Sequence, residues 1–117
     1  MDKVDIMAEV VGLLGEIVFI SGPITGMPDL NIPAFNAADK KIRRTGAAVY
    51  NPASLPLGND WQWYMDQCFK AMQDCTAIYQ LLGWENSRGA RIENEWALEL
   101  GLSFITDSEI EKYLEEE

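Results

Sequence analysis

Residues 83–101 read Gly-Trp-Glu-Asn-Ser-Arg-Gly-Ala-Arg-Ile-Glu-Asn-Glu-Trp-Ala-Leu-Glu-Leu-Gly, and the rest of the chain is best interpreted from this stretch outward. It opens with a polar turn that contains glycine. The turn leads into a predicted helix, in which Ile92, Trp96 and Leu100 recur at spacings of four. The sequence therefore predicts a helix that begins near Ser87.

Glu93 is the unusual residue of this helix. Four apolar residues lie three, four or seven positions away and share its helical face: Ala90, Trp96, Ala97 and Leu100. A carboxylate on an apolar face is costly to bury unless it is paired, hydrogen-bonded or catalytic. Two interpretations stay open. Glu93 either forms a structural ion pair with Arg88, Arg91 or another cation, or it is a functional group of a site.

The composition limits what the chain binds. A length of 117 residues suits one domain with a single core. The formal net charge of −10 opposes binding to a nucleic-acid backbone or to an anionic membrane. We therefore expect neither polymeric nucleic acid nor a membrane as a partner. A small anionic ligand remains compatible with this charge where arginines or helix ends neutralise it locally.

Histidine and cysteine usage narrows the chemistry. The chain has no histidine, which excludes Ser-His-Asp and Cys-His nucleophile systems and removes the commonest metal ligand. Cys68 and Cys75 lie seven positions apart in one predicted helix and its exit. That separation, about 10 Å, is too long for a disulfide, and two sulfurs do not make a zinc site. We expect reduced core cysteines, a cytoplasmic location, and no metal or organic cofactor.

Strands and helices are predicted to alternate along the chain. Short runs rich in β-branched and aromatic residues predict strands at residues 16–21, 47–50, 76–82 and 103–105. Apolar residues at spacings of three and four predict helices at residues 1–15, from about residue 31 to 45, after Asp60, after Ser87, and at residues 106–117. Asp60 is expected to cap its helix. Thr106 with Glu109, and Ser108 with Glu111, each fit a capping box.

This alternation predicts a three-layer α/β domain of the Rossmann or flavodoxin-like kind, with a small parallel sheet of about four strands flanked by helices. Residues 1–15 are expected to form an amphipathic helix, residues 16–106 the domain, and residues 107–117 an acidic terminal helix. No stretch approaches a transmembrane span, and the acidic start argues against a signal peptide.

Ligands of such sheets bind beyond the carboxyl ends of the strands. Three loops meet this condition, at residues 22–26, 51–57 and 83–89. The helix that begins near Ser87 offers free amides and a partial positive charge, and Arg88 adds a full one. A phosphate or similar anion could bind there, although many α/β proteins use such a turn only to cap a helix.

Several short motifs together suggest a family. They are Ile-Ser-Gly-Pro-Ile-Thr-Gly after the first strand, Asn31 with Phe35, Asn51-Pro52 after the second strand, Gly83-Trp84, Ser-Arg-Gly-Ala-Arg-Ile-Glu ending at Glu93, and residues 97–101. Across residues 17–105 the chain resembles the nucleoside 2-deoxyribosyltransferase-like superfamily. Within it, the resemblance is greater to a small branch of domains of unknown function that is common in phages and prophages.

The resemblance implies a chemistry. In this superfamily the glutamate that ends the Ser-x-Gly-x-x-x-Glu pattern attacks the anomeric carbon of a ribosyl or deoxyribosyl group and expels the base. It implies that Glu93 is the nucleophile, that a small nucleoside or nucleotide is the substrate, and that water or another base accepts the sugar. The implied substrate-binding or phosphate-binding residues follow the strands: Ser21, Gly22, Pro23, Thr25, Gly26, Asn51, Ser87, Arg88 and Gly89. It also implies a homo-oligomer, since relatives complete their sites across a subunit interface.

Two positions depart from the superfamily. Thr76 stands where relatives carry an aspartate at the start of the third strand, and Phe19 stands where many carry a tyrosine in the first strand. Asp74 is the candidate that takes over the catalytic role of the missing carboxylate. Four further residues are possible acids: Asp60, Tyr64, Asp66 and Glu85. A second function therefore stays open, that of a catalytically silent protein of phage or prophage origin that binds or sequesters nucleotides.

Overall fold

A computed structural model describes residues 13–115 of the chain. Its elements are, in order, β1 (Ile17–Ser21), the short 3₁₀ helix η1 (Pro28–Asn31), α2 (Ile32–Arg43), β2 (Ala48–Tyr50), η2 (Pro52–Ser54), α3 (Trp61–Met72), β3 (Ala77–Gln80), η3 (Trp84–Asn86), α4 (Arg88–Leu100), β4 (Ser103–Ile105) and α5 (Asp107–Glu115). The predicted strands and the helices from residue 31 onward are thus confirmed. The helix predicted at residues 1–15 lies outside the described residues for most of its length, and residues 13–15 form a turn.

The four strands form one parallel sheet in the order β2-β1-β3-β4. β1 pairs with β2 from Ile17 opposite Ala48, and with β3 from Val18 opposite Ala77. β3 pairs with β4, so β1 and β3 are the inner strands. Each parallel connection passes through a helix, as strand–helix–strand units require.

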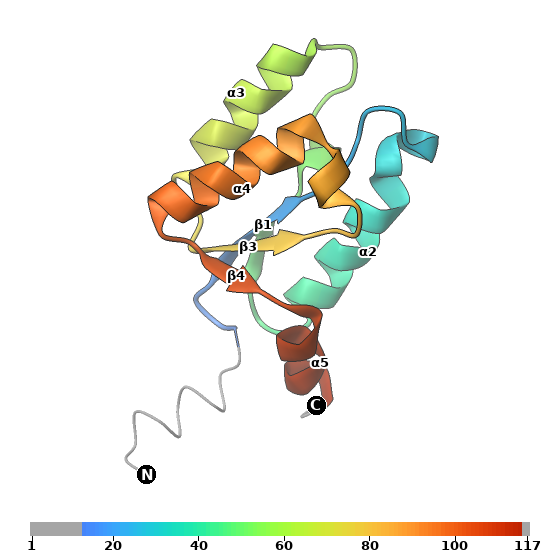
Figure 1. The fold of residues 1–117 in the computed structure, drawn as a ribbon. Coiled ribbons are helices and arrows are strands. Elements are labelled where there is room, and N and C mark those ends of the chain that lie inside the picture. Colours follow the sequence, from blue (N-terminus) through green and yellow to red (C-terminus); the bar gives the residue numbers. More distant parts are fainter. Residues whose placement is uncertain (1–12, 116–117) are drawn as a thin grey trace.

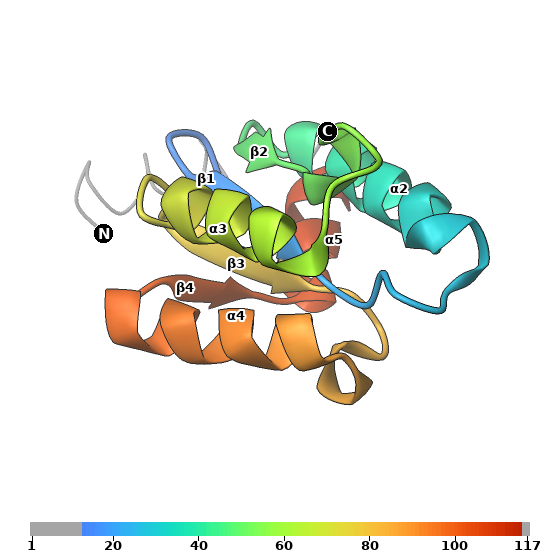
Figure 2. The ribbon, with the colours of Figure 1, turned by 90° about the horizontal axis from the view of Figure 1, so that it is seen from above.

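Helices cover both faces of this sheet, which confirms the three-layer α/β fold (Figures 1 and 2). The buried apolar side chains form two clusters, one on each face of the sheet. Val18 and Ile20 of β1 belong to the cluster that includes residues of α2 and α5. Phe19, between them, belongs to the cluster that includes residues of α3 and α4. The period of two in a strand therefore directs alternate side chains into the two halves of the core.

Side-chain caps fix where the helices begin. The Asp60 carboxylate accepts a hydrogen bond from the Trp63 amide at 2.8 Å, as predicted. Thr106 accepts from the Glu109 amide at 3.3 Å and its hydroxyl donates to the Glu109 carboxylate, so Thr106 caps α5, which is one half of the first predicted capping box. The second box does not form, because Ser108 already lies within α5.

Cys68 and Cys75 are buried and unpaired, in agreement with the expectation of free core thiols. Both belong to the cluster between the sheet and α3/α4. Among the helices of residues 13–115, none combines the length and the apolarity needed to cross a bilayer.

The turn before α2 holds three consecutive non-glycine residues in the left-handed region: Asp29, Leu30 and Asn31, with φ of 51°, 53° and 60°. Such a conformation costs an L-residue about 1–2 kcal/mol. The Asn31 side chain anchors the turn by donating to the Pro23 carbonyl at 2.9 Å.

Replacing Asp29 with glycine is expected to stabilise the protein. The substitution removes the left-handed strain from the folded state. Glycine also gives the unfolded chain more conformational freedom, which offsets about half of that gain, so the free energy of unfolding should rise by up to about 1 kcal/mol. Urea denaturation measures it. The matched control is Gly26→Ala, at φ 81° with open space around the added Cβ, which should lose about 1 kcal/mol. A loss of stability in Asp29→Gly would contradict the prediction.

Candidate functional site

Glu93 lies on the buried face of α4, as its helical spacing predicted. Leu100, expected on the same face, is instead 42 % exposed because it lies at the end of the helix. Ala90 is 1 % exposed, Glu93 6 % and Ala97 0 %. This face packs over β1 and β3, the inner strands of the sheet. The carboxylate is therefore held against the centre of the sheet rather than at its edge.

Two side chains from other elements contact this carboxylate. The hydroxyl of Ser21, the last residue of β1, donates a hydrogen bond to Glu93 Oε1 at 2.6 Å. Ser21 is itself fully buried. The thiol of Cys68, from α3, also interacts with Glu93 and lowers its pKa. A strand and two helices thus converge on one carboxylate.

The alternative interpretation of Glu93, a structural ion pair, is not what the structure shows. Within the described residues, no ion pair includes Glu93. The guanidinium of Arg88 lies over the ring of Trp61, 4.4 Å from its centroid. Arg91 donates to the backbone carbonyl of Glu85 at 3.0 Å. The two arginines named as partners are therefore engaged elsewhere.

Burial controls the acidity of this site. Desolvation raises the pKa of Glu93 from 4.5 to about 7, and the hydrogen bonds from Ser21 and Cys68 oppose that rise. Burial, and then the charge of Glu93, raise the pKa of the Cys68 thiol. Cys68 thus remains a protonated donor, and Glu93 exchanges its proton near neutral pH.

A cavity of about 750 Å³ opens onto Glu93. Six of the predicted site residues line it: Gly22, Thr25, Ser87, Arg88, Gly89 and Glu93. Because Glu93 lines the cavity and is almost completely buried, its carboxylate lies at the inner end. The cavity is at the carboxyl ends of the strands, where ligands of parallel sheets bind.

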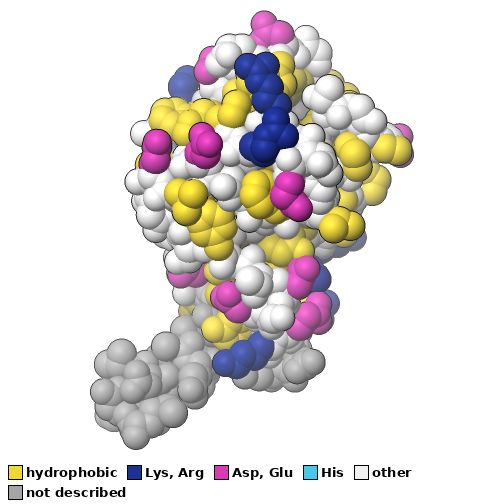
Figure 3. Space-filling model, viewed as in Figure 1, with side chains coloured by type: hydrophobic (Ala, Val, Ile, Leu, Met, Phe, Trp, Pro, Cys, Tyr) yellow, Lys and Arg dark blue, Asp and Glu magenta, His cyan; other side chains and the backbone are white. Residues whose placement is uncertain are grey.

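The amino terminus of α4 forms one wall of this cavity. Ser87 caps the helix by accepting from the Ala90 amide at 3.2 Å, and the amides of Arg88 and Gly89, in the first turn, have no acceptor within the helix. Arg88 adds a full positive charge, and Figure 3 shows basic side chains gathered over this part of the surface. This wall suits an anionic group.

A family match covers the elements that build the site. The family described as Domain of unknown function (DUF4406) matches residues 16–106, which span all four strands and α4. The chain belongs to this family. No curated protein matches the chain.

Not all predicted site residues of the DUF4406 domain line the cavity. The lining does not include Pro23, Gly26, Asn51 or Asp74. Ser21 is also outside the lining, but it donates a hydrogen bond to Glu93, which lines the cavity. Asp74 is exposed and precedes β3, at the amino end of the sheet, whereas Glu93 is reached from the carboxyl end. The structure therefore does not bring Asp74 to Glu93.

Asn51 and Gly22 have structural roles in the fold of this DUF4406 domain. The Asn51 amide donates to Asn36 and Asp39 of α2, each at 3.0 Å, and its oxygen accepts from the Ala53 amide. These bonds fix the loop after β2 to α2. Gly22 lies so close to Leu81 that an added Cβ would be 2.7 Å from the Leu81 Cβ. Gly22 thus permits β1 and the end of β3 to approach closely.

The two departures from the superfamily pattern lie in different places. Thr76 bonds to Glu16 and to the Ile17 amide at the amino end of the sheet. Phe19 is fully buried and stacks on Tyr50, with ring centroids 5.6 Å apart. Burial is the main cause that raises the pKa of Tyr50, and electrostatic interactions with Cys68, Cys75 and Glu93 add to it. Tyr50 of β2 thus stacks on Phe19 but is not among the residues that line the Glu93 cavity.

The other possible acids are mostly engaged elsewhere. Asp60 caps α3, Asp66 accepts from Gln62, and Glu85 lines a different cavity. Tyr64 lines the Glu93 cavity, and its hydroxyl donates to the Pro56 carbonyl at 2.6 Å. In residues 13–115, no group of three or more histidine, cysteine, aspartate or glutamate side chains could hold a metal ion.

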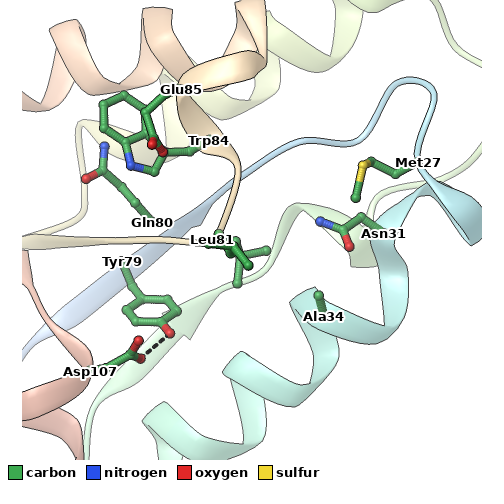
Figure 4. A pocket seen from close by; sticks show the side chains of 10 residues that line it. Met27, Asn31, Ala34, Tyr79, Gln80, Leu81, Trp84, Glu85 and Asp107 are labelled. Carbon is green, nitrogen blue, oxygen red and sulfur yellow. Dashed lines mark hydrogen bonds between the residues drawn. The ribbon is translucent and has the colours of Figure 1, made fainter.

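The second cavity, of about 530 Å³, lies between η1, η3 and the start of α5 (Figure 4). Tyr79 and Asp107, both in its lining, are hydrogen-bonded to each other. Of the residues considered for the site, the possible acid Glu85 lines this cavity, but the two cavities share no lining residue. It is therefore separate from the Glu93 site.

Sequence reasoning missed part of the site. Cys68 was interpreted only as a core residue, and the apolar residues Leu30, Leu55, Leu57 and Trp61, which line the cavity, were not singled out. Cys68 lies on the buried face of α3 with Met65 and Met72, and that pattern indicates a core position but not contact with Glu93. For the loop leucines the sequence holds no such periodic signal.

Proposed function

We propose that this protein cleaves, or transfers, the N-glycosidic bond of a small nucleoside or nucleotide, with Glu93 as the nucleophile. The observation that carries the proposal is the nearly buried Glu93 carboxylate, which accepts from Ser21 at 2.6 Å at the inner end of a cavity. A buried carboxylate with no cation beside it is costly for stability, which favours a catalytic role.

The reaction proceeds in two steps. In the first, an oxygen of ionised Glu93 attacks the anomeric carbon of the sugar, the carbon–nitrogen bond breaks, and its electron pair leaves with the base, which takes up a proton. In the second, water attacks the same carbon, expels the Glu93 carboxylate and loses a proton. A second base in place of water gives transfer instead of hydrolysis.

The residues around Glu93 suit these steps. The donors Ser21 and Cys68 orient the carboxylate and keep part of it ionised near neutral pH, since both lower its pKa. The wall formed by Ser87, Arg88 and Gly89 fits a 5′-phosphate, which would place the sugar between that wall and Glu93. The resemblance of residues 17–105 to the nucleoside 2-deoxyribosyltransferase-like superfamily supports the same assignment.

A second candidate function is the binding of nucleotides without turnover. It is favoured by one observation: among the described residues that line the cavity, Glu93 is the only carboxylate. A glycosidase of this type commonly uses a second acid to protonate the leaving group. Tyr64 lines the cavity, but its hydroxyl already donates to a backbone carbonyl.

One experiment separates the two functions. The protein is incubated with a panel of nucleosides and 5′-monophosphates, both ribo and 2′-deoxy, and analysed by chromatography for released base and by intact-protein mass spectrometry. The catalytic function predicts free base and a transient mass increase equal to the sugar or sugar phosphate, absent in Glu93→Ala. Saturable binding with neither product would support the second function and contradict the first.

A further inference from the structure

Large apolar side chains are exposed at the mouth of the Glu93 cavity. Leu30 is 41 % exposed, Leu57 69 % and Trp61 37 %, and all three line the cavity. They come from η1, from the loop after η2 and from the first turn of α3. Exposed apolar groups that gather at one cavity mark a binding surface more often than scattered ones do.

The cavity has two walls of different chemistry. The wall at the start of α4 is polar and basic, with Asn86, Ser87 and Arg88. The other wall comes from the loop after β2 and has five residues without a hydrogen-bonding side chain: Pro52, Ala53, Leu55, Leu57 and Gly58. Glu93 lies at the inner end. A ligand with an anionic group at one end and an apolar, planar group at the other matches this arrangement.

We infer that the apolar wall binds the base of the nucleotide through its faces and apolar substituents, rather than through hydrogen bonds to its edges. This inference rests on the proposed function for the sugar chemistry at Glu93. It assigns the substrate class as 5′-mononucleotides, with broad tolerance of the base. Among bases of equal size, those that carry an apolar substituent bind best. Leu57 is the specificity-determining residue, because it is the most exposed of the leucines in this wall.

The expected selectivity follows from the area of one methyl group. Thymidine and 2′-deoxyuridine 5′-monophosphates differ only by a methyl group at C5. Burying one methyl group against leucine corresponds to about a four-fold change in affinity. A site that reads hydrogen bonds at the base edge would not favour the methylated base, since the two bases carry the same donors and acceptors.

The test measures dissociation constants by isothermal titration calorimetry, in the full chain carrying Glu93→Gln so that no turnover intervenes. Thymidine monophosphate should bind about four-fold more tightly than deoxyuridine monophosphate. Adding Leu57→Asn should reduce the preference to less than two-fold. The matched control is Leu98→Asn, because Leu98 is 64 % exposed but lies on α4 outside the cavity lining, and the preference should remain there.

Other outcomes overturn the inference. Equal affinity for the two nucleotides does so, as does a preference that survives Leu57→Asn. A preference that survives Leu57→Asn but is abolished by Asn59→Ala, at the end of the same loop, would place the methyl contact elsewhere on the loop and overturn the assignment to Leu57. Methyl preference without base release by the wild type would overturn the catalytic proposal alone. Base release without methyl preference would overturn this inference alone, and no binding of any nucleotide would overturn both.

Discussion

Glu93→Gln is expected to lower the rate of base release on the order of a thousandfold or more, while nucleotide affinity changes only a few-fold. The amide has nearly the shape of the carboxylate, and its oxygen still accepts from Ser21, so the cavity keeps its form. It cannot serve as the nucleophile, because it lacks the negative charge. Single-turnover kinetics with a 5′-monophosphate measures the rate, and calorimetry measures the affinity.

The control for this variant lies two residues away on the same helix. Glu95 is exposed and lies outside the cavity lining, so Glu95→Gln makes the same chemical change without touching the site. It should keep the wild-type rate. If Glu93→Gln retained more than about a tenth of the activity, Glu93 would be a structural carboxylate. The base release would then have to be assigned to another group of the cavity.

The location of Glu93 could be predicted because it depends on one helix alone. Its period places Ala90, Glu93 and Ala97 on one face, and those are the buried residues of α4. The parallel sheet followed in the same way from strands alternating with helices, and its carboxyl end defined the loops of the site. Local periodicity and capping were thus sufficient for the fold and for the central residue.

The remaining parts of the site depend on contacts between elements distant in sequence. Ser21 and Glu93 are 72 positions apart, and nothing local to Cys68 indicates that its thiol meets the same carboxylate. Asn51 illustrates the opposite case. Its position at the end of a strand suggested substrate binding, but its amide is used by α2. The exposure of Leu57 is likewise set by tertiary packing, which no periodic pattern reports.

The same carboxylate should make stability depend on pH. The pKa of Glu93 rises from 4.5 to about 7 on folding, because burial disfavours its charged form. The folded state therefore binds this proton more tightly than the unfolded state does. The contribution of Glu93 to stability is fully present below pH 4.5 and is lost as the pH rises through about 7. Since each tenfold change in proton affinity corresponds to about 1.4 kcal/mol, the loss amounts to about 3 kcal/mol.

Comparison with Glu93→Gln isolates this contribution from the repulsion among the other acidic groups of a chain with a net charge of −10. Urea denaturation is measured for both proteins from pH 4.5 to 8. Relative to the variant, the wild type should lose about 3 kcal/mol across that range, with most of the loss before pH 7. Glu95→Gln should run parallel to the wild type, because Glu95 is exposed in the folded state. A constant difference between wild type and Glu93→Gln would mean that the carboxylate is solvated in the folded protein. It would remove the argument that burial prepares Glu93 for attack on a sugar.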